Sequence, residues 1–324
     1  MSTRTKGSVT EFVLRTPAVG PAIALAVAVV LFAATTDTFL NSDNLSLIVQ
    51  QSLVVGTLAL GQTLVILTGG IDLANAATAV MGTLLMAKLV VGGVSGPVAL
   101  VTGIAVAVAI GALVGGIVTG ASLPPFIVTL GMLTIVTAVS RIYAEGRSYP
   151  VTDDVLSFLG TRQYLFGHIE VTVGMGLALL MYLGLWYSLT RTAWGKHVYA
   201  VGNDPEAARL SGINVRRTVL SVYVVAGLVY GIAAWQALGR VPNADPNAFQ
   251  MGNLDSITAV VLGGTSLFGG RGSVLGTLVG ALIVAVLRSG LTQAGIDSLY
   301  QDVATGVLVI VAVAVDRFSR RKQR

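Results

Sequence analysis

Cysteine is absent from the sequence, and only two of its 324 residues are histidine. The missing cysteines exclude a disulfide framework and a thiolate metal site, and two distant histidines argue against a zinc site. Charged residues are also scarce, at 11%, whereas 54% of the residues are hydrophobic. This composition indicates an integral membrane protein with several spans. The net charge of +5 comes from basic clusters beside apolar segments, which favours membrane orientation over nucleic-acid binding.

The motifs of common enzymes are missing as well. The single Gly-Lys pair, Gly195-Lys196, has no glycine-rich approach, which excludes a Walker A loop and ATP hydrolysis by this polypeptide. The sequence contains neither a Gly-x-Ser-x-Gly elbow nor an HExxH zinc motif. The GGRGS segment at 269–273 favours a tight turn over a dinucleotide loop, because no strand precedes it. We therefore expect no catalytic residue, cofactor or metal in this chain.

Apolar runs long enough to cross a bilayer dominate the sequence. Taking about 20 apolar residues per span, we count ten predicted transmembrane helices, at 17–36, 45–67, 71–92, 97–118, 125–144, 170–189, 218–238, 254–268, 273–293 and 299–316. The first run resembles a secretory signal, but its length favours a membrane span. The sequence thus predicts an all-α polytopic transmembrane bundle forming one domain over 1–324. Its parts are a membrane-embedded core at 16–316, a polar loop at 190–217 and a basic tail at 317–324.

Lysine and arginine are distributed unevenly between the two sides that ten spans define. With the N-terminus inside, the inner segments hold 14 of the 20 basic residues, and the outer segments hold only Arg147, Arg162 and Arg240. An excess of basic residues marks cytoplasmic segments. We therefore predict that both termini and the 190–217 loop face the cytoplasm.

An internal repeat relates two glycine-interrupted segments. ILTGGIDLANAATAVMGTL, from Ile66, aligns with VVLGGTSLFGGRGSVLGTL, from Val260, at a constant offset of 194. In the predicted topology both copies enter from outside and return outward, so the repeat is parallel. Repeated halves with broken helices are a common way to build a transporter around a central path. Shared glycine and leucine composition is the alternative explanation.

The polar loop carries the signals of a short capped helix. Asp204 suits the N-cap, Pro205 the first helical position, Glu206 the positive end of the dipole and Gly212 the left-handed stop. Ala207, Ala208 and Ser211 are small and Arg209 offers a charged contact, so we interpret 205–211 as a docking helix for a partner. The alternative is an ordinary capped helix within a loop.

Polar residues within the spans suit a neutral hydroxylated solute. Few ionisable groups lie there, which argues against proton or sodium coupling; they are Asp72, Lys88, Arg141, Asp255, Arg288 and Asp302. Uncharged groups that could lend transient hydrogen bonds are Gln50, Gln51, Gln62, Asn75, Thr129 and Gln301. Our predicted solute path comprises Gln50, Gln51, Gln62, Asp72, Asn75 and Thr129. For each uncharged residue taken alone, hydrogen bonding between helices is the favoured alternative.

Three segments together resemble a known family: WGKHVYAVGNDPEAARLSGI, LPPFIVTLGM and AVVLGGTSLFGGRGSVLGTLVGAL. They are similar to the ribose-type sugar permeases of bacterial ABC importers, related to the branched-chain amino-acid permeases, over about 44–316. The resemblance implies an all-helical permease of the bacterial inner membrane, in contact with lipid and paired with a second copy or paralogue. It also implies two cytoplasmic ABC ATPase subunits that carry ATP and Mg²⁺, and an extracytoplasmic solute-binding protein.

Residues that couple to the ATPase follow from the same resemblance, position by position. They are Gly202, Asn203, Glu206, Ala207, Ala208, Arg209, Gly212 and Ile213. The chain departs from the family pattern where the fifth span continues as TAVSRIYAEGRSYPV, which leaves the outer vestibule and its solute open.

We therefore expect the permease subunit of an ATP-driven importer, forming the path for a monosaccharide or a similar small polyol. Branched-chain amino acids and nucleosides are alternative solutes. A self-sufficient secondary carrier is disfavoured by the sparse charges within the spans, and a membrane enzyme by the missing catalytic sets. Neither the particular sugar nor the choice between homodimer and heterodimer follows from the sequence.

Overall fold

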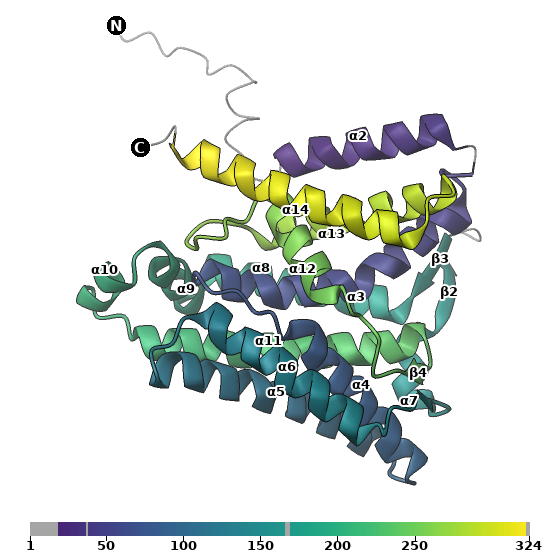
Figure 1. The fold of residues 1–324 in the computed structure, drawn as a ribbon, viewed down its shortest axis with the longest axis horizontal. Coiled ribbons are helices and arrows are strands. Elements are labelled where there is room, and N and C mark those ends of the chain that lie inside the picture. The colour runs from purple at the N-terminus through teal and green to yellow at the C-terminus, as the bar shows by residue number, and fades with distance from the viewer. Residues whose placement is uncertain (1–18, 37, 166–168, 322–324) are drawn as a thin grey trace, which may run out of the picture.

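The computed structural model describes residues 19–36, 38–165 and 169–321 and is almost entirely helical (Figure 1). Ten helices coincide one by one with the ten predicted spans: α2 Val19–Thr35, α3 Ser42–Leu67, α4 Asn75–Val91, α5 Gly96–Gly120, α6 Pro125–Tyr143, α8 Val173–Arg191, α11 Val215–Arg240, α12 Gly252–Leu262, α13 Val274–Gln293 and α14 Ser298–Arg321. The predicted all-α bundle is thereby confirmed. Residues 1–18, with the basic residues Arg4, Lys6 and Arg15, and the end of the basic tail at 322–324 lie outside the described residues.

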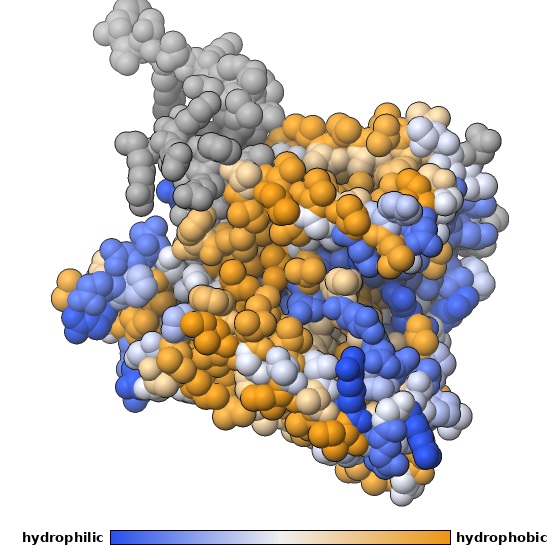
Figure 2. All heavy atoms as spheres, viewed as in Figure 1, coloured by the Kyte–Doolittle hydropathy of each residue, from blue (hydrophilic) through white to orange (hydrophobic). Residues whose placement is uncertain are grey.

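Six of the described helices are long and apolar enough to cross a membrane, namely α3, α5, α6, α8, α11 and α13. Four shorter apolar helices accompany them. On the face shown in Figure 2, much of the surface over the helices is hydrophobic, and the α10 end and the ribbon end are more hydrophilic. A hydrophobic surface is expected for a protein whose solvent is lipid. The chain is a multi-pass membrane protein.

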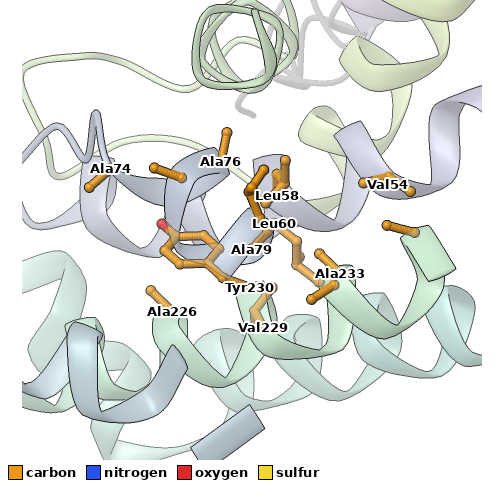
Figure 3. Close-up of a cluster of buried hydrophobic side chains, with 14 of the residues drawn as sticks. Val54, Leu58, Leu60, Ala74, Ala76, Ala79, Ala226, Val229, Tyr230 and Ala233 are labelled. Carbon is orange, nitrogen blue, oxygen red and sulfur yellow. The ribbon is translucent and has the colours of Figure 1, made fainter. Parts of the chain in front are cut away.

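The core forms where α11 crosses α5 and α3. A Cβ at Gly227 would lie 3.0 Å from the Cα of Val108, and one at Gly111 would lie 3.1 Å from the Cα of Gly227, so only glycine permits this approach of α5 and α11. Small residues that bring backbones together are typical of membrane helix interfaces, where packing rather than water drives association. Near this contact on α11, Tyr230 reaches toward Ala74 and Ala76 (Figure 3).

Both copies of the predicted repeat form a helix, a glycine turn and a second helix. Gly69 after α3 and Gly264 after α12 both take a left-handed φ of +81°, and equivalent hydrogen bonds join Gly70 to Val65 and Thr265 to Val260. Left-handed glycines of this kind end helices. The glycine turn at Gly264 therefore ends α12 earlier than predicted, at Leu262 rather than at 268.

The register of the repeat differs from the sequence alignment. Matching the left-handed glycines requires an offset of 195 instead of 194 (264 minus 69), and the loop at 263–273 is longer than the loop at 68–74. Gly82 consequently lies well inside α4, whereas Gly276 lies in the first turn of α13. Common glycine and leucine content therefore accounts for the matches after the loop.

Short β-ribbons cover the end of the bundle opposite α9 Ala193–Asn203 and α10 Pro205–Leu210 (Figure 1). β1 Tyr149–Pro150 pairs with β4 Asn243–Ala244, and β2 Arg162–Leu165 pairs with β3 Ile169–Thr172, both antiparallel. Two small helical turns, α7 Asp154–Ser157 and η1 Phe158–Gly160, lie beside them. These elements were not predicted from the sequence, because the strands are too short to show alternation.

Candidate functional site

The polar loop folds into two helices that project from one end of the bundle. α10 has the predicted cap: the Asp204 Oδ1 accepts from the backbone N–H groups of Glu206 and Ala207, at 2.9 and 3.0 Å. It also has the predicted stop, since Gly212 takes a φ of +85° and the Ile213 N–H donates to the Ala208 carbonyl at 3.0 Å. α9 was not foreseen as a separate helix, although the Thr192 hydroxyl caps it by accepting from Gly195 N–H at 3.3 Å.

α9 ties the polar loop to the membrane core. Trp194 Nε1 donates to Ser221 Oγ on α11 at 2.8 Å, and the Tyr199 hydroxyl donates to the Gly272 carbonyl at 2.9 Å. At its last turn, Gly202 packs directly against the Leu67 carbonyl at the end of α3, and Gly270 N–H donates to that same carbonyl at 3.0 Å. Both glycine loops of the repeat therefore meet the end of α9.

The residues predicted to couple to an ATPase point in two directions. Ala208 is 4% exposed and Gly202 packs against the glycine loops, so both face the protein. The outward-facing members are Asn203, Glu206, Ala207, Arg209 and Gly212, and Ile213 is half-buried.

Leu210, which the sequence analysis did not single out, is 76% exposed at the end of α10. The signal available in the sequence was a large apolar residue within a charged loop, where exposure to solvent is expected. Beside it, Arg209 and Glu206 form an ion pair of 2.6 Å. The Arg209 guanidinium lowers the pKa of Glu206 below its usual value.

Four of the predicted path residues brace the loop at 68–74. The Gln62 carboxamide is oriented so that both its oxygen and its nitrogen have partners. The oxygen accepts from the Asp72 backbone N–H at 3.2 Å, and the nitrogen donates to the Asp72 carbonyl at 3.0 Å. Asn75 Nδ2 donates to Ser256 Oγ at 2.7 Å, and Thr129 Oγ1 donates to the Ile71 carbonyl at 2.9 Å.

The Asp72 carboxylate accepts from Ala74 N–H at 2.8 Å and is 4% exposed. Gln62, Asn75 and Thr129 are fully buried. The structure thus brings these four residues together as hydrogen-bond partners of a loop and of each other. Their role in a solute path stays a prediction.

The other two predicted path residues lie on α3 at the ribbon end. Gln50 Nε2 donates to Glu170 Oε1 at 2.9 Å, and Gln51 is half-buried. Gln50 also lines a cavity of about 210 Å³ together with Arg162, Gln236 and Arg240. Gln50 and Gln51 are therefore separate from the group around Asp72.

Two of the basic side chains on the membrane helices, Arg288 and Lys88, form ion pairs. Arg288 Nη2 on α13 lies 2.8 Å from Asp255 Oδ1 on α12 and 3.2 Å from Asp302 Oδ1 on α14. Lys88 Nζ lies 3.1 Å from Glu145 Oε1 and donates to the Tyr143 carbonyl at 2.6 Å. Among the described residues, no three histidine or acidic side chains gather closely enough to hold a metal ion.

A second cavity, of about 280 Å³, opens between α4, α6 and the segment that leads into α12. Thr137, Arg141, Phe249, Gln250 and Asn253 line it, together with small and apolar side chains. Figure 2 shows hydrophilic surface in this region, between the hydrophobic surfaces of α6 and α14. We use the name polar strip for the surface formed by Thr137, Arg141, Gln250 and Asn253. Of these four, the sequence analysis noted only Arg141, as an ionisable group.

Comparison with known proteins identifies relatives along nearly the whole chain. Residues 44–313 match the family described as "Branched-chain amino acid transport system / permease component". The fructose import permease protein FrcC of Rhizobium meliloti is 40% identical over 96% of this chain and 88% of its own length. The ribose import permease protein RbsC of Escherichia coli K12 is 37% identical over 91% and 92%, and the D-allose permease AlsC of the same strain is 32% identical over 98% of each.

No solved structure matches the chain. The sequence relatives nevertheless confirm the resemblance that the three segments carried, and they do so over the same span of the chain. The chain belongs to the family of branched-chain amino acid transport system permease components and is similar to import permeases for fructose, ribose and D-allose.

Proposed function

We propose that this chain is the permease subunit of an ABC importer for a monosaccharide or similar small polyol in a bacterial inner membrane. The observation that carries the proposal is the position of α9 and α10. One end of this pair offers exposed side chains to a partner, and the other end packs against both glycine loops of the membrane core. A force applied to α10 by a cytoplasmic ATPase would reach both repeats through α9.

The exposed contact surface consists of Glu206, Arg209 and Leu210. Leu210 is the only large apolar side chain of α10 that is exposed, among the residues described. Arginine is enriched among the residues that carry most of an interface's binding energy, and an exposed leucine beside it offers an apolar contact to the partner. ATP and Mg²⁺ would be held by the ATPase. The excess of basic residues on the inner segments supports a cytoplasmic position for α10.

The polar strip supports pairing with a second permease copy or a paralogue. It lies between apolar helices, where lipid offers no hydrogen bonds to Thr137, Gln250 and Asn253. A partner that covers the strip would spare these groups the cost of contact with hydrocarbon and would leave a polar path between the two chains. The ribbon end, opposite α10, would then receive solute from a binding protein.

The test is the removal of the proposed anchor. We expect Leu210→Ala with Arg209→Ala to weaken ATPase binding by about 2 kcal/mol, or about 30-fold, and to abolish ATP-driven uptake in proteoliposomes. The matched control is Leu179→Ala, an exposed leucine of α8 that is 55% exposed. Full copurification of the ATPase with the double variant, or concentrative uptake by the permease without any ATPase, would overturn the proposal.

A further inference from the structure

The cavity beneath the polar strip lies within the thickness of the membrane helices. Gly252, at the start of α12, is so close to Ala76 and Leu58 that an added Cβ would lie 3.1 and 3.7 Å from their side chains. Leu58 is in the second half of α3, so the segment that enters α12 returns to mid-bundle depth. A polar cavity at that depth needs a polar occupant, whether water or a solute.

The lining of this cavity selects the chemistry of the occupant. Thr137 and Gln250 offer uncharged hydrogen-bonding groups, and Asn253 Nδ2 already donates to the Leu73 carbonyl at 3.0 Å, which directs its carboxamide oxygen to a different donor. Arg141 is the one cation among the lining residues, and no carboxylate lines the cavity. An amino acid would leave its ammonium group without a counter-charge, so the lining favours a neutral solute with several hydroxyl groups.

Phe249 adds an aromatic surface to the polar groups. It takes a left-handed φ of +55°, which bulky side chains rarely adopt. The hydrogen bond from Gly252 N–H to the Phe249 carbonyl, at 2.8 Å, and the lack of space for a side chain at Gly252 hold it there. Convergent polar groups with one aromatic wall are the usual composition of a small-molecule site.

We propose that this cavity binds one monosaccharide in transit, with Phe249 against the carbon face of the sugar and Thr137, Gln250 and Asn253 bonding its hydroxyl groups. The site rests on the proposed import function, and it assigns contact residues that differ from those predicted around Asp72. The cavity of about 210 Å³ at the ribbon end is the competing location. It is the more charged of the two, because two arginines line it, Arg162, which pairs with Glu170 at 3.2 Å, and Arg240.

The absence of cysteine makes a direct test available, because any introduced thiol is the only one in the permease. We would introduce Thr137→Cys in the complete importer, with Gln50→Cys in the competing cavity as the matched control, and measure the rate of reaction with a small thiol reagent during ATP turnover. The probes are D-fructose, D-ribose and L-leucine. We expect the transported sugar to slow the reaction of Thr137→Cys at least about fivefold, since a bound solute covers most of the wall it contacts, and to leave Gln50→Cys unchanged.

A second pair of variants separates binding from folding. Phe249→Asn removes the ring while keeping a residue that tolerates a left-handed backbone, and Phe249→Tyr keeps the ring. We expect the asparagine variant to lower sugar uptake about tenfold, an order of magnitude typical for an aromatic anchor, and the tyrosine variant to retain it. Both should copurify with the ATPase as the wild type does.

The outcomes distinguish this inference from the proposed function. Failure of the ATPase to copurify with the wild-type permease would overturn the import function itself. A wild-type importer that hydrolyses ATP and takes up sugar, but shows no protection at Thr137→Cys, would overturn only the binding site. Protection at Gln50→Cys instead would move the site to the ribbon end, and protection of Thr137→Cys by L-leucine alone would overturn its assignment to sugars.

Discussion

At the scale of single residues, the close approach of three backbone segments is the feature on which the proposed coupling depends. Gly202 at the end of α9, Leu67 at the end of α3 and Gly270 in the second repeat loop are in direct contact. Gly270 also has a φ of +70°, which favours glycine at that position. The contact leaves no room for a side chain at Gly202.

Gly202→Ala should therefore destabilise the permease by about 2 kcal/mol or more, because the new methyl group would overlap the Leu67 carbonyl. The measurement is the thermal unfolding temperature of the purified protein in detergent. Gly116→Ala is the control, because an added Cβ there meets nothing within 4 Å. An unfolding temperature equal to that of the control would show that α9 can move away from α3 at little cost.

At the scale of elements, α10 is too short to persist through its own hydrogen bonds. A helix of this length in isolation is unfavourable in water because nucleation is costly. The helix is stabilised instead by its N-cap at Asp204, its left-handed stop at Gly212 and the burial of Ala208. The order of α10 therefore depends on a few named residues.

Asp204→Ala should destabilise α10 by about 1 kcal/mol, the usual cost of losing an N-cap side chain. Hydrogen exchange of the Glu206 and Ala207 amides, which donate to Asp204, measures the effect. Asp204→Asn keeps a capping oxygen and should exchange like the wild type. Equal exchange in the alanine variant would mean that packing of Ala208 alone orders the helix.

At the scale of the whole molecule, the ion cluster of Asp255, Arg288 and Asp302 joins three helices from the C-terminal part of the chain. The sequence analysis listed these groups individually, and the structure pairs them. Unpaired charges within the membrane helices are costly, whereas paired ones are tolerated. The cluster thus holds α14 against α12 and α13.

Arg288→Met should destabilise the protein by about 3 kcal/mol, because it leaves Asp255, which is 7% exposed, buried without its counter-charge. Adding Asp255→Asn and Asp302→Asn to that variant should restore much of the loss, since no unpaired charge then remains. Thermal unfolding of the single and triple variants in detergent is the measurement. A triple variant no more stable than the single one would show that the cluster acts through shape rather than charge.

Different parts of the protein were predictable for different physical reasons. The ten spans and the α10 helix followed from local signals, namely apolar length and the residues Asp204, Pro205 and Gly212 at cap and stop positions. For Gln62, Asn75 and Thr129, hydrogen bonding between elements was the favoured alternative, but their particular partners were not predictable. A buried polar side chain has the same sequence signature whichever neighbour it bonds. The two copies of the repeat were aligned one residue out of register, because the loop between the two helices of each copy differs in length and sequence patterns do not fix that length.

The sequence by itself determined that this protein is a helical membrane bundle of a permease family with a capped helix on a polar loop, because apolar length, charge bias and capping chemistry act over a few neighbouring residues. Only the tertiary structure decided which faces of those helices meet. It turned Ala208 inward and Leu210 outward, brought Gly202 to both repeat loops, and gathered Thr137, Phe249 and Asn253 around one cavity. These outcomes depend on contacts between separate elements, such as Gly202 with Leu67 and with Gly270, which local sequence patterns do not encode.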